Sequence, residues 1–492
     1  MSQPQAATPG QQAPPVAAEQ IARAHVPLGV LVAIACVAQL MVVLDTTIVN
    51  VALPAMKAAL GLSASGQQWI VNGYLITFGG FLLFGARAGD LFGRREVLQI
   101  GLAVFTLASL AGGLAQDPGL LIGARVVQGA AAAALAPSSL SLITASHPEG
   151  HARNRAMMIW GLMAVSGGAI GLLLGGVLTT ELSWRYVLFV NIPIGLVMLV
   201  AAGVSLMPSP PTRGQQRLDL PGTLTITAGI GALVYGISEA NDKGWGSVPV
   251  VVPLIAAAVL IAAFIVIERS SRAPLVPLGI FRHRSLSVSN VIMALLGVIL
   301  TASLFFVSLY LQQVLGFSAL RTGLAMLPMA MIMAVAAIAS RPLMTKVDPR
   351  ALLAAGGVVG AGGLAWLSRI PVHSGYAAHV LGPTMVLGVG LALMMLPLTI
   401  FSTAGIGPRE AGLASGLVNM GRQLGGAIGL AVLVTVASSV TRHGHLPSPA
   451  AAVVHGYSWA LLGCAAVSLA AAVVPVLLPR PARPSGTAAI IE

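Results

Sequence analysis

An acidic residue, Asp45, lies inside the apolar segment 28–51, which is long enough to cross a membrane as a helix. An ionised side chain at the centre of such a helix costs about 2.5 to 3.5 kcal/mol on insertion scales, so intramembrane acids usually carry a function. A carboxylate there can take up a proton and release it as water reaches it from alternate sides. We therefore predict that Asp45 is a proton-coupling residue. The alternative is a structural cap or ion pair.

Arg125 lies in a second apolar segment, 120–145, and is the expected partner of Asp45. The two segments run in opposite directions. Asp45 comes about 17 residues after the start of its segment and Arg125 about 5 after the start of the other, so both lie at a similar depth. We predict that Arg125 tunes the protonation of Asp45. The alternative is a static arginine that holds the helices together.

Polar side chains form a stripe on a later apolar segment, 412–438. Asn419 and Arg422 are three residues apart with Gln423 beside them, so they share one side of a helix. Arg422 is about 15 Å into the segment by helical rise, where a charge must face protein or water. Hydrogen bonding between helices is the alternative to a binding role. The residues predicted to line a substrate cavity are Gln128, Asn419, Arg422 and Gln423.

The composition excludes a soluble domain. Of the 492 residues, 57% are hydrophobic and 8% are charged, against about 25% charged in a soluble protein. The net charge of +12 is spread over short loops rather than gathered in one patch, so nucleic acid is not the expected partner. The cysteines, Cys36 and Cys464, lie in apolar segments and are predicted to be packed thiols.

No chemistry-bearing motif of an enzyme occurs in the sequence. There is no phosphate-binding loop of the GxxxxGK[ST] type, no constellation of an intramembrane hydrolase, and no histidine spacing typical of a metal site. We therefore predict a protein that is not an enzyme and that needs no cofactor or metal, with the proton as its coupling ion.

Fourteen apolar segments are long enough to span a lipid bilayer, and backbone in lipid must satisfy its own hydrogen bonds, so all are expected to be helices. Long unbroken apolar runs exclude the alternating pattern of a membrane barrel. The prediction is an all-α polytopic membrane protein. Its segments are 28–51, 69–89, 97–115, 120–145, 157–180, 184–206, 220–239, 249–268, 287–312, 320–340, 351–368, 377–402, 412–438 and 457–478.

The basic residues predict the orientation of these helices. Cytoplasmic loops carry an excess of Lys and Arg. With both termini inside, 18 of the 26 Lys and Arg residues fall on the cytoplasmic side, six fall outside, and Arg125 and Arg422 remain in the membrane. We predict a multi-pass protein of the cell membrane, monomeric, with both termini cytoplasmic. The six outer residues are Lys57, Arg185, Lys243, Arg321, Arg369 and Arg442.

Two polar breaks, at 207–222 and 268–286, divide the helices into six, two and six. Two six-helix halves with a binding site between them are a known plan of transporters. The central pair is then an insertion. The predicted parts are a disordered tail (1–26), an N-terminal six-helix bundle (27–206), a linker with two extra membrane helices (207–286), a C-terminal six-helix bundle (287–480) and a second tail (481–492).

Several motifs follow one another in the order and on the segments of a known family. They include VLDTTIVNVALP at 43–54, GARAGDLFGRREVL at 85–98, LIGARVVQGAAAA at 121–133 and SWRYVLFVNIPIG at 183–195. The chain resembles the fourteen-helix drug:proton antiporter branch of the major facilitator superfamily over almost its whole length. The resemblance implies the major facilitator fold. It also implies export of small amphipathic or apolar organic compounds, such as drugs or antibiotics, against protons by alternating access.

Within the second of these motifs, the resemblance implies a gate that closes the cytoplasmic side. Glycines permit the tight turn, and the charges can pair across the two halves or meet a helix terminus. A positive-inside anchor would also account for the two arginines. The residues concerned are Gly85, Gly89, Asp90, Gly93, Arg94 and Arg95.

The fifth segment carries a glycine motif similar to the family's antiporter motif. It keeps Gly171, Gly175 and Gly176 but has Leu172 where the family usually has proline. Proline would remove a helix hydrogen bond and kink the segment, and glycines alone still allow close packing. Two alternatives to drug export therefore stay open. They are proton-coupled transport of one specific metabolite, outward or inward, and a non-transporting membrane sensor.

Overall fold

The structure, a computed structural model, describes residues 28–146, 150–206, 218–271, 273–372, 375–407, 410–444, 446 and 448–478. Within these ranges it contains fourteen helices long and apolar enough to cross a membrane, and no strand. The predicted all-α fold with fourteen membrane helices is confirmed. The tails predicted at 1–26 and 481–492 lie outside the described residues.

The helices follow the order of the predicted segments, and short π or 3₁₀ stretches extend or precede some of them. They are α2 (Leu28–Leu60), α3 (Ala64–Phe92), α4 (Arg94–Gly113), α5 (Pro118–Ser146), α6 (His151–Val177) with η1 (Leu178–Leu182), α7 (Tyr186–Phe189) with α8 (Asn191–Ser205), α9 (Leu220–Lys243), α10 (Val248–Ser270), η2 (Leu278–Arg282), α11 (Arg284–Leu309) with η3 (Tyr310–Val314), α12 (Ala319–Lys346), α13 (Pro349–Leu367), η4 (Ala377–Leu381) with α14 (Gly382–Thr403), α15 (Ala411–His443), and α16 (Pro449–Val473) with η5 (Val474–Leu477).

Several helices are longer than their apolar segments predict. α2 continues through Pro54 to Leu60, and α16 begins at Pro449 rather than at 457. Apolar length measures the part of a helix that lies in lipid, whereas a helix ends where its backbone is capped. At α16 the cap is Ser448, whose hydroxyl accepts a hydrogen bond from the Ala451 backbone N–H at 3.2 Å.

One glycine joins α3 to α4 without a loop. Gly93 is the residue between the two helices, and its φ of +104° lies in the region that favours glycine. A side chain at this position would be strained. The turn between these helices is therefore short and fixed, which keeps the charged residues around it close to the helix ends.

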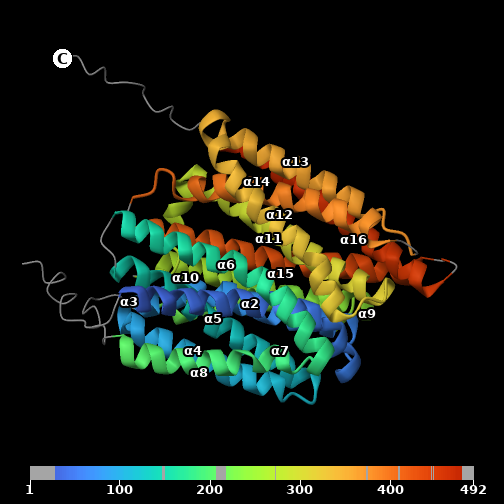
Figure 1. Cartoon of the computed structure of the whole chain (residues 1–492), viewed down its shortest axis with the longest axis horizontal. Coiled ribbons are helices and arrows are strands. Elements are labelled where there is room, and N and C mark those ends of the chain that lie inside the picture. Colours follow the sequence, from blue (N-terminus) through green and yellow to red (C-terminus); the bar gives the residue numbers. More distant parts are fainter. Residues whose placement is uncertain are drawn as a thin grey trace, which may run out of the picture.

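The helices pack as two groups (Figure 1). In the first, α2 to α8, α2 packs on α6, α5 packs on α3, and α4 packs on α5 and α8. In the second, α11 to α16, α11 packs on α15 and α13 packs on α14 and α16. The groups meet where α3 contacts α15 and α6 contacts α12. Figure 1 shows α4 and α8 at one edge of the molecule and α13 at the opposite edge.

The extra pair, α9 and α10, packs mainly on itself and touches both groups through α9, which contacts α3 and α15. Close approach at this junction depends on Gly80 of α3, where an added Cβ would collide with the side chain of Thr227. These contacts support the predicted plan of two six-helix halves with an inserted pair, whose boundaries stay a prediction.

We name the two ends of the bundle by the two ends of α2, the Leu28 end and the Leu60 end. Hydrogen bonds between the two groups lie at the Leu60 end. The Ser308 hydroxyl donates to the Asn50 carbonyl at 3.0 Å, and the Gln312 amide donates to the Val51 carbonyl at 3.0 Å. These bonds hold α2 against α11 at that end.

The core contains two buried thiols. Cys36 and Cys464 are both buried and free, as expected of packed thiols. Among the described residues, no group of three or more His, Cys, Asp and Glu side chains is placed to hold a metal ion.

Candidate functional site

Asp45 is the centre of a buried polar cluster. Its side chain is fully buried, and three donors surround the carboxylate. Arg125 Nη1 donates to Oδ2 at 2.5 Å. Gln128 Nε2 and Asn191 Nδ2 donate to Oδ1 at 3.2 Å and 2.9 Å. Helices α2, α5 and α8 therefore meet at one carboxylate.

Arg125 is held in place by more than its ion pair. Its Nε donates to the Ile70 carbonyl at 3.2 Å, its Nη1 also donates to Gln128 Oε1 at 2.9 Å, and its guanidinium lies 4.5 Å from the centre of the Tyr74 ring. The three-residue spacing of Arg125 and Gln128 puts both on one face of α5. The arginine is thus oriented by α3 and α5 together.

This geometry stabilises the ionised form of Asp45. A buried carboxylate is tolerated when a cation pairs with it and donors satisfy its oxygens. Asp45 has both, in a site closed to solvent. Protonation would remove the negative charge and leave Arg125 buried without its counterion. The charge state of Asp45 therefore governs how tightly α2, α5 and α8 are held together.

Tyr74 joins the cluster from α3. Its side chain is buried, and the Arg125 guanidinium lies over its ring. Its hydroxyl donates to the Val42 carbonyl at 3.4 Å. Tyr74 of α3 is therefore in contact with both α2 and α5.

The four residues predicted to line a substrate cavity occupy two environments. Asn419 is exposed and Arg422 is partly exposed on one face of α15, where Arg422 Nη2 donates to Asn419 Oδ1 at 3.4 Å. Gln423 is buried and packs against Gly79 of α3. Gln128 is fully buried in the Asp45 cluster. The structure brings Asn419 and Arg422 together on the open face and keeps the two glutamines away from it.

The charged residues of the predicted gate contact their own group of helices. Asp90 and Arg94 form an exposed ion pair at 3.6 Å. Arg94 Nη1 donates to the Ser141 carbonyl at 3.4 Å and Arg95 Nη2 to the Gly203 carbonyl at 2.8 Å, near the ends of α5 and α8. Favourable contacts of cations with helix C-termini are expected. Across the described part of the chain, no ion pair joins these side chains to α11–α16.

One gate glycine allows close packing on α5. An added Cβ at Gly85 would collide with the Ala133 carbonyl, whereas one at Gly89 would lie 3.7 Å from the Ser138 hydroxyl oxygen, an ordinary contact. Gly85 is therefore needed for packing and Gly93 for the turn, whereas the space at Gly89 would accept a Cβ.

The glycine motif of α6 lies between the helix of Asp45 and the second group. Gly171 and Gly175 face α2, where an added Cβ would collide with Thr47 and Ile48. Gly176 faces the Ala319–Leu320 backbone of α12. Leu172, at the position of the family's proline, is buried, and its carbonyl leaves no room for a Cβ at Gly323 of α12. The three glycines therefore add no side chain of their own where α6 meets α2 and α12.

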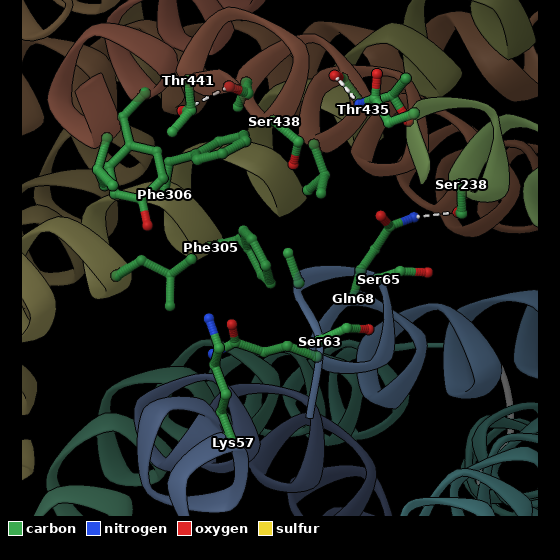
Figure 2. A pocket seen from close by; sticks show the side chains of 18 of the residues that line it. Lys57, Ser63, Ser65, Gln68, Ser238, Phe305, Phe306, Thr435, Ser438 and Thr441 are labelled. Atoms are coloured by element: carbon green, nitrogen blue, oxygen red, sulfur yellow. Dashed lines mark hydrogen bonds between the residues drawn. The ribbon is translucent and has the colours of Figure 1, made fainter. Parts of the chain in front are cut away.

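A cavity of about 430 Å³ opens at the Leu60 end between the two groups and α9 (Figure 2). Lys57, Ser63 and Gln68 lie on one side of it, and Phe305 and Phe306 of α11 face them. The hydroxyls of Thr435, Ser438 and Thr441 come from α15, and Gln68 Nε2 donates to Ser238 of α9 at 3.0 Å. Aromatic faces beside amides and hydroxyls suit a partly polar organic molecule.

Sequence reasoning missed two members of the Asp45 cluster, Asn191 and Ser109. Ser109 Oγ accepts a hydrogen bond from Gln128 Nε2 at 2.6 Å. Asn191 is a polar residue near the start of an apolar segment. This was a usable signal, because helical rise places Asn191 at a depth in the membrane similar to that of Asp45. Ser109 carries no such signal, since a serine in a membrane helix usually bonds to its own backbone.

Comparisons with known proteins agree with this architecture. Residues 35–430 match the model of the Major Facilitator Superfamily. The chain is 45% identical over 453 residues to the cephamycin export protein CmcT of Amycolatopsis lactamdurans, and 92% of each chain is covered. It is 41% identical over 452 residues to the puromycin resistance protein pur8 of Streptomyces alboniger, covering 90% of this chain and 89% of that one.

Among solved structures, the crystal structure of the POT family transporter PepTSo matches with a TM-score of 0.66 at 12% identity, over 91% of this chain and 97% of that one. At this identity the likeness concerns the fold alone. The family predicted from the motifs is confirmed by the match over 35–430 and by the two relatives. The chain is a multi-pass membrane protein and belongs to the major facilitator superfamily.

Proposed function

We propose that the protein exports a small apolar or amphipathic compound of the antibiotic type in exchange for protons that bind at Asp45. The observation that carries the proposal is the buried Asp45 carboxylate with its three donors, the partner Arg125 among them. An exchangeable proton in the membrane needs a group with two accessible charge states, and this carboxylate is well stabilised in one of them.

The cycle follows from the two ends of the bundle. With both termini in the cytoplasm, the Leu28 end faces inward. The contacts of Ser308 and Gln312, which join α2 to α11 at the Leu60 end, and the exposure of Asn419 on α15 then support a state open to the cytoplasm. An ionised, fully hydrogen-bonded Asp45 suits the state in which the proton has just left to the cytoplasm and the compound can enter.

Proton uptake from the other side would complete the exchange. Protonation removes the charge that holds Arg125, so α2, α5 and α8 loosen, and the glycine faces of α6 let α2 move against α12. One proton moving inward supplies about 2.3 kcal/mol for each roughly 100 mV of membrane potential. The gate residues Asp90 and Arg94 are proposed to close the Leu28 end in the opposite state.

The binding surface proposed for the compound includes the open face of α15. Asn419 supplies an amide and Arg422 a positive charge. This set suits a neutral or acidic compound better than a cation. The two relatives, a cephamycin export protein and a puromycin resistance protein, support an antibiotic as cargo and export as the direction.

The experiment uses everted membrane vesicles that contain wild-type protein or Asp45→Asn. Respiration acidifies the vesicle interior, and a pH-sensitive dye reports proton release when a cephamycin or puromycin is added. Wild type is expected to release protons with at least one compound and to accumulate it. Asp45→Asn is expected to lose both by about tenfold or more while it still binds the compound.

Glu239→Gln is the matched control, because Glu239 is an acid near the surface, paired with Lys243 at 3.2 Å at the end of α9. It is expected to behave as wild type. Full proton-coupled accumulation in Asp45→Asn would refute the coupling role. If neither antibiotic is transported and one metabolite moves with protons, the result would favour the alternative of a transporter specific for one metabolite. Leu172, in place of the family's proline, is the reason that this alternative stays open.

A further inference from the structure

Two more buried acids lie at the Leu28 end, in the extra helix pair. Asp219 precedes α9, and its side chain is 6% exposed. Glu268 lies in the last turn of α10, and its side chain is 3% exposed. The α9–α10 hairpin brings them together although they are far apart in the chain. Neither contributes to the Asp45 cluster.

Each of these carboxyls uses one oxygen and leaves the other free. Asp219 Oδ1 accepts from the Gly222 backbone N–H at 2.8 Å, and Glu268 Oε2 accepts from the Val276 backbone N–H at 3.0 Å. Asp219 Oδ2 and Glu268 Oε1 are buried and have no hydrogen-bond partner among the described residues.

The two free oxygens face the same small space. A Cβ added to Gly222 would lie 2.8 Å from Asp219 Oδ2 and 3.0 Å from Glu268 Oε1. Both oxygens are therefore close to one point beside the Gly222 backbone. Any larger residue at position 222 would fill this space, whereas glycine leaves it open.

The cation nearest to this pair is not bonded to it. The charged groups close to Glu268 are the acid Asp219 and the cation Arg87, and Arg87 forms its hydrogen bonds with backbone carbonyls instead. Its Nη1 donates to the carbonyls of Pro274 at 2.6 Å and Ala273 at 3.3 Å. In the described part of the chain neither acid forms an ion pair.

We propose that Asp219 and Glu268 form a second proton-binding site, in which one proton is shared between Asp219 Oδ2 and Glu268 Oε1. Two like charges beside one point in a buried site are unfavourable, whereas a carboxylic acid beside a carboxylate can satisfy both free oxygens with one hydrogen bond. A metal cation would need about six oxygen ligands, and this site offers two free ones.

The bound proton ties the extra helix pair to the gate segment. Glu268 holds Val276, the carbonyls just before Val276 hold Arg87, and Arg87 lies between the gate glycines Gly85 and Gly89 of α3. Loss of the proton would drive the two acids apart and shift the segment that Arg87 grips. This site is independent of the compound and of Asp45, so it stands whether or not the protein exports antibiotics.

The test uses the purified full-length protein in lipid nanodiscs. The folded protein holds a proton that the unfolded chain has lost at neutral pH, so the stability from this site is present at low pH and decreases as pH rises. Wild type is expected to lose roughly 2–4 °C of melting temperature as this proton leaves. An infrared C=O stretch of a protonated carboxyl should disappear over the same pH range.

Glu268→Gln and Asp219→Asn each keep a donor between the two side chains but have no shared proton to lose. Each is expected to remove that infrared band and that part of the pH dependence, while Glu239→Gln retains both. The wild-type spectrum tests the site even if one variant fails to fold. A band and pH dependence unchanged in the two pair variants would overturn the proposal. So would stabilisation by Na⁺ that replaces the dependence on pH.

Discussion

Asp45 and Glu268 are both buried acids in membrane helices, and their surroundings differ in one respect. Asp45 has a cation at 2.5 Å and amide donors on its other oxygen. Glu268 has one backbone donor and a second acid beside it. The first environment favours the ionised carboxylate, and the second favours a retained proton.

The difference teaches that burial alone does not decide the charge of a membrane acid. Removing water disfavours charge at both sites, so the difference between them comes from the partner. At Asp45, changes of partner geometry during transport can change the charge. At Glu268 the partner is an acid, and only the proton can relieve their repulsion.

The largest expected effect comes from removing the cation of the first site. Arg125→Gln leaves Asp45 buried without a counterion and is expected to lower the free energy of unfolding by about 3–5 kcal/mol. Asp45→Asn in the same chain should restore most of that loss, because it removes the unpaired charge. Unfolding in mixed micelles measures both variants. A double variant that is less stable than Arg125→Gln would contradict the assigned ion pair.

A second change would place a pair of acids in the Asp45 cluster, like the pair formed by Asp219 and Glu268. Asn191→Asp places a carboxyl where the amide donates to Asp45 Oδ1 at 2.9 Å. The folded variant would then hold a proton that the unfolded chain has lost. Its stability should therefore rise as pH falls, by up to about 1.4 kcal/mol per pH unit. Asn191→Ala is the control without this slope, and equal pH profiles for the two would refute the interpretation.

The smallest expected effect sharpens the boundary of the first site. Ser109 contacts Gln128 and not the carboxylate. Ser109→Ala removes one buried hydrogen bond and should cost about 0.5–1.5 kcal/mol. The melting temperatures of Ser109→Ala and Arg125→Gln in the same lipid show how the two losses of stability compare. A loss as large as that of Arg125→Gln would mean that the serine belongs to the charged site itself.

The fold was predictable because the signals are local. Fourteen apolar stretches of sufficient length specify fourteen helices, since lipid excludes other backbone structures. The pairing of Asp45 with Arg125 was also within reach, because rise per residue gives the depth of each side chain. Depth does not give rotation about the helix axis, so the separation of Gln423 from Asn419 and Arg422 was not predictable.

The second acid pair could not be foreseen for a similar reason. Asp219 and Glu268 stand at the ends of two helices, where acids normally meet water. Their burial depends on the segment that follows α10, whose Leu275 and Val276 are themselves buried. No periodicity in the sequence reports how such a segment folds back over a helix end.

The glycines of α6 have a consequence for rate. Helices that interlock through side chains must lift over one another to slide, whereas α6 presents Cα hydrogens to α2 at Gly171 and Gly175 and to α12 at Gly176. A surface without ridges offers few intermediate resting positions, so we expect the barrier between the two orientations of the halves to be low. The glycines of α6 would then determine the rate of turnover. The polar clusters would determine what is carried in each turnover.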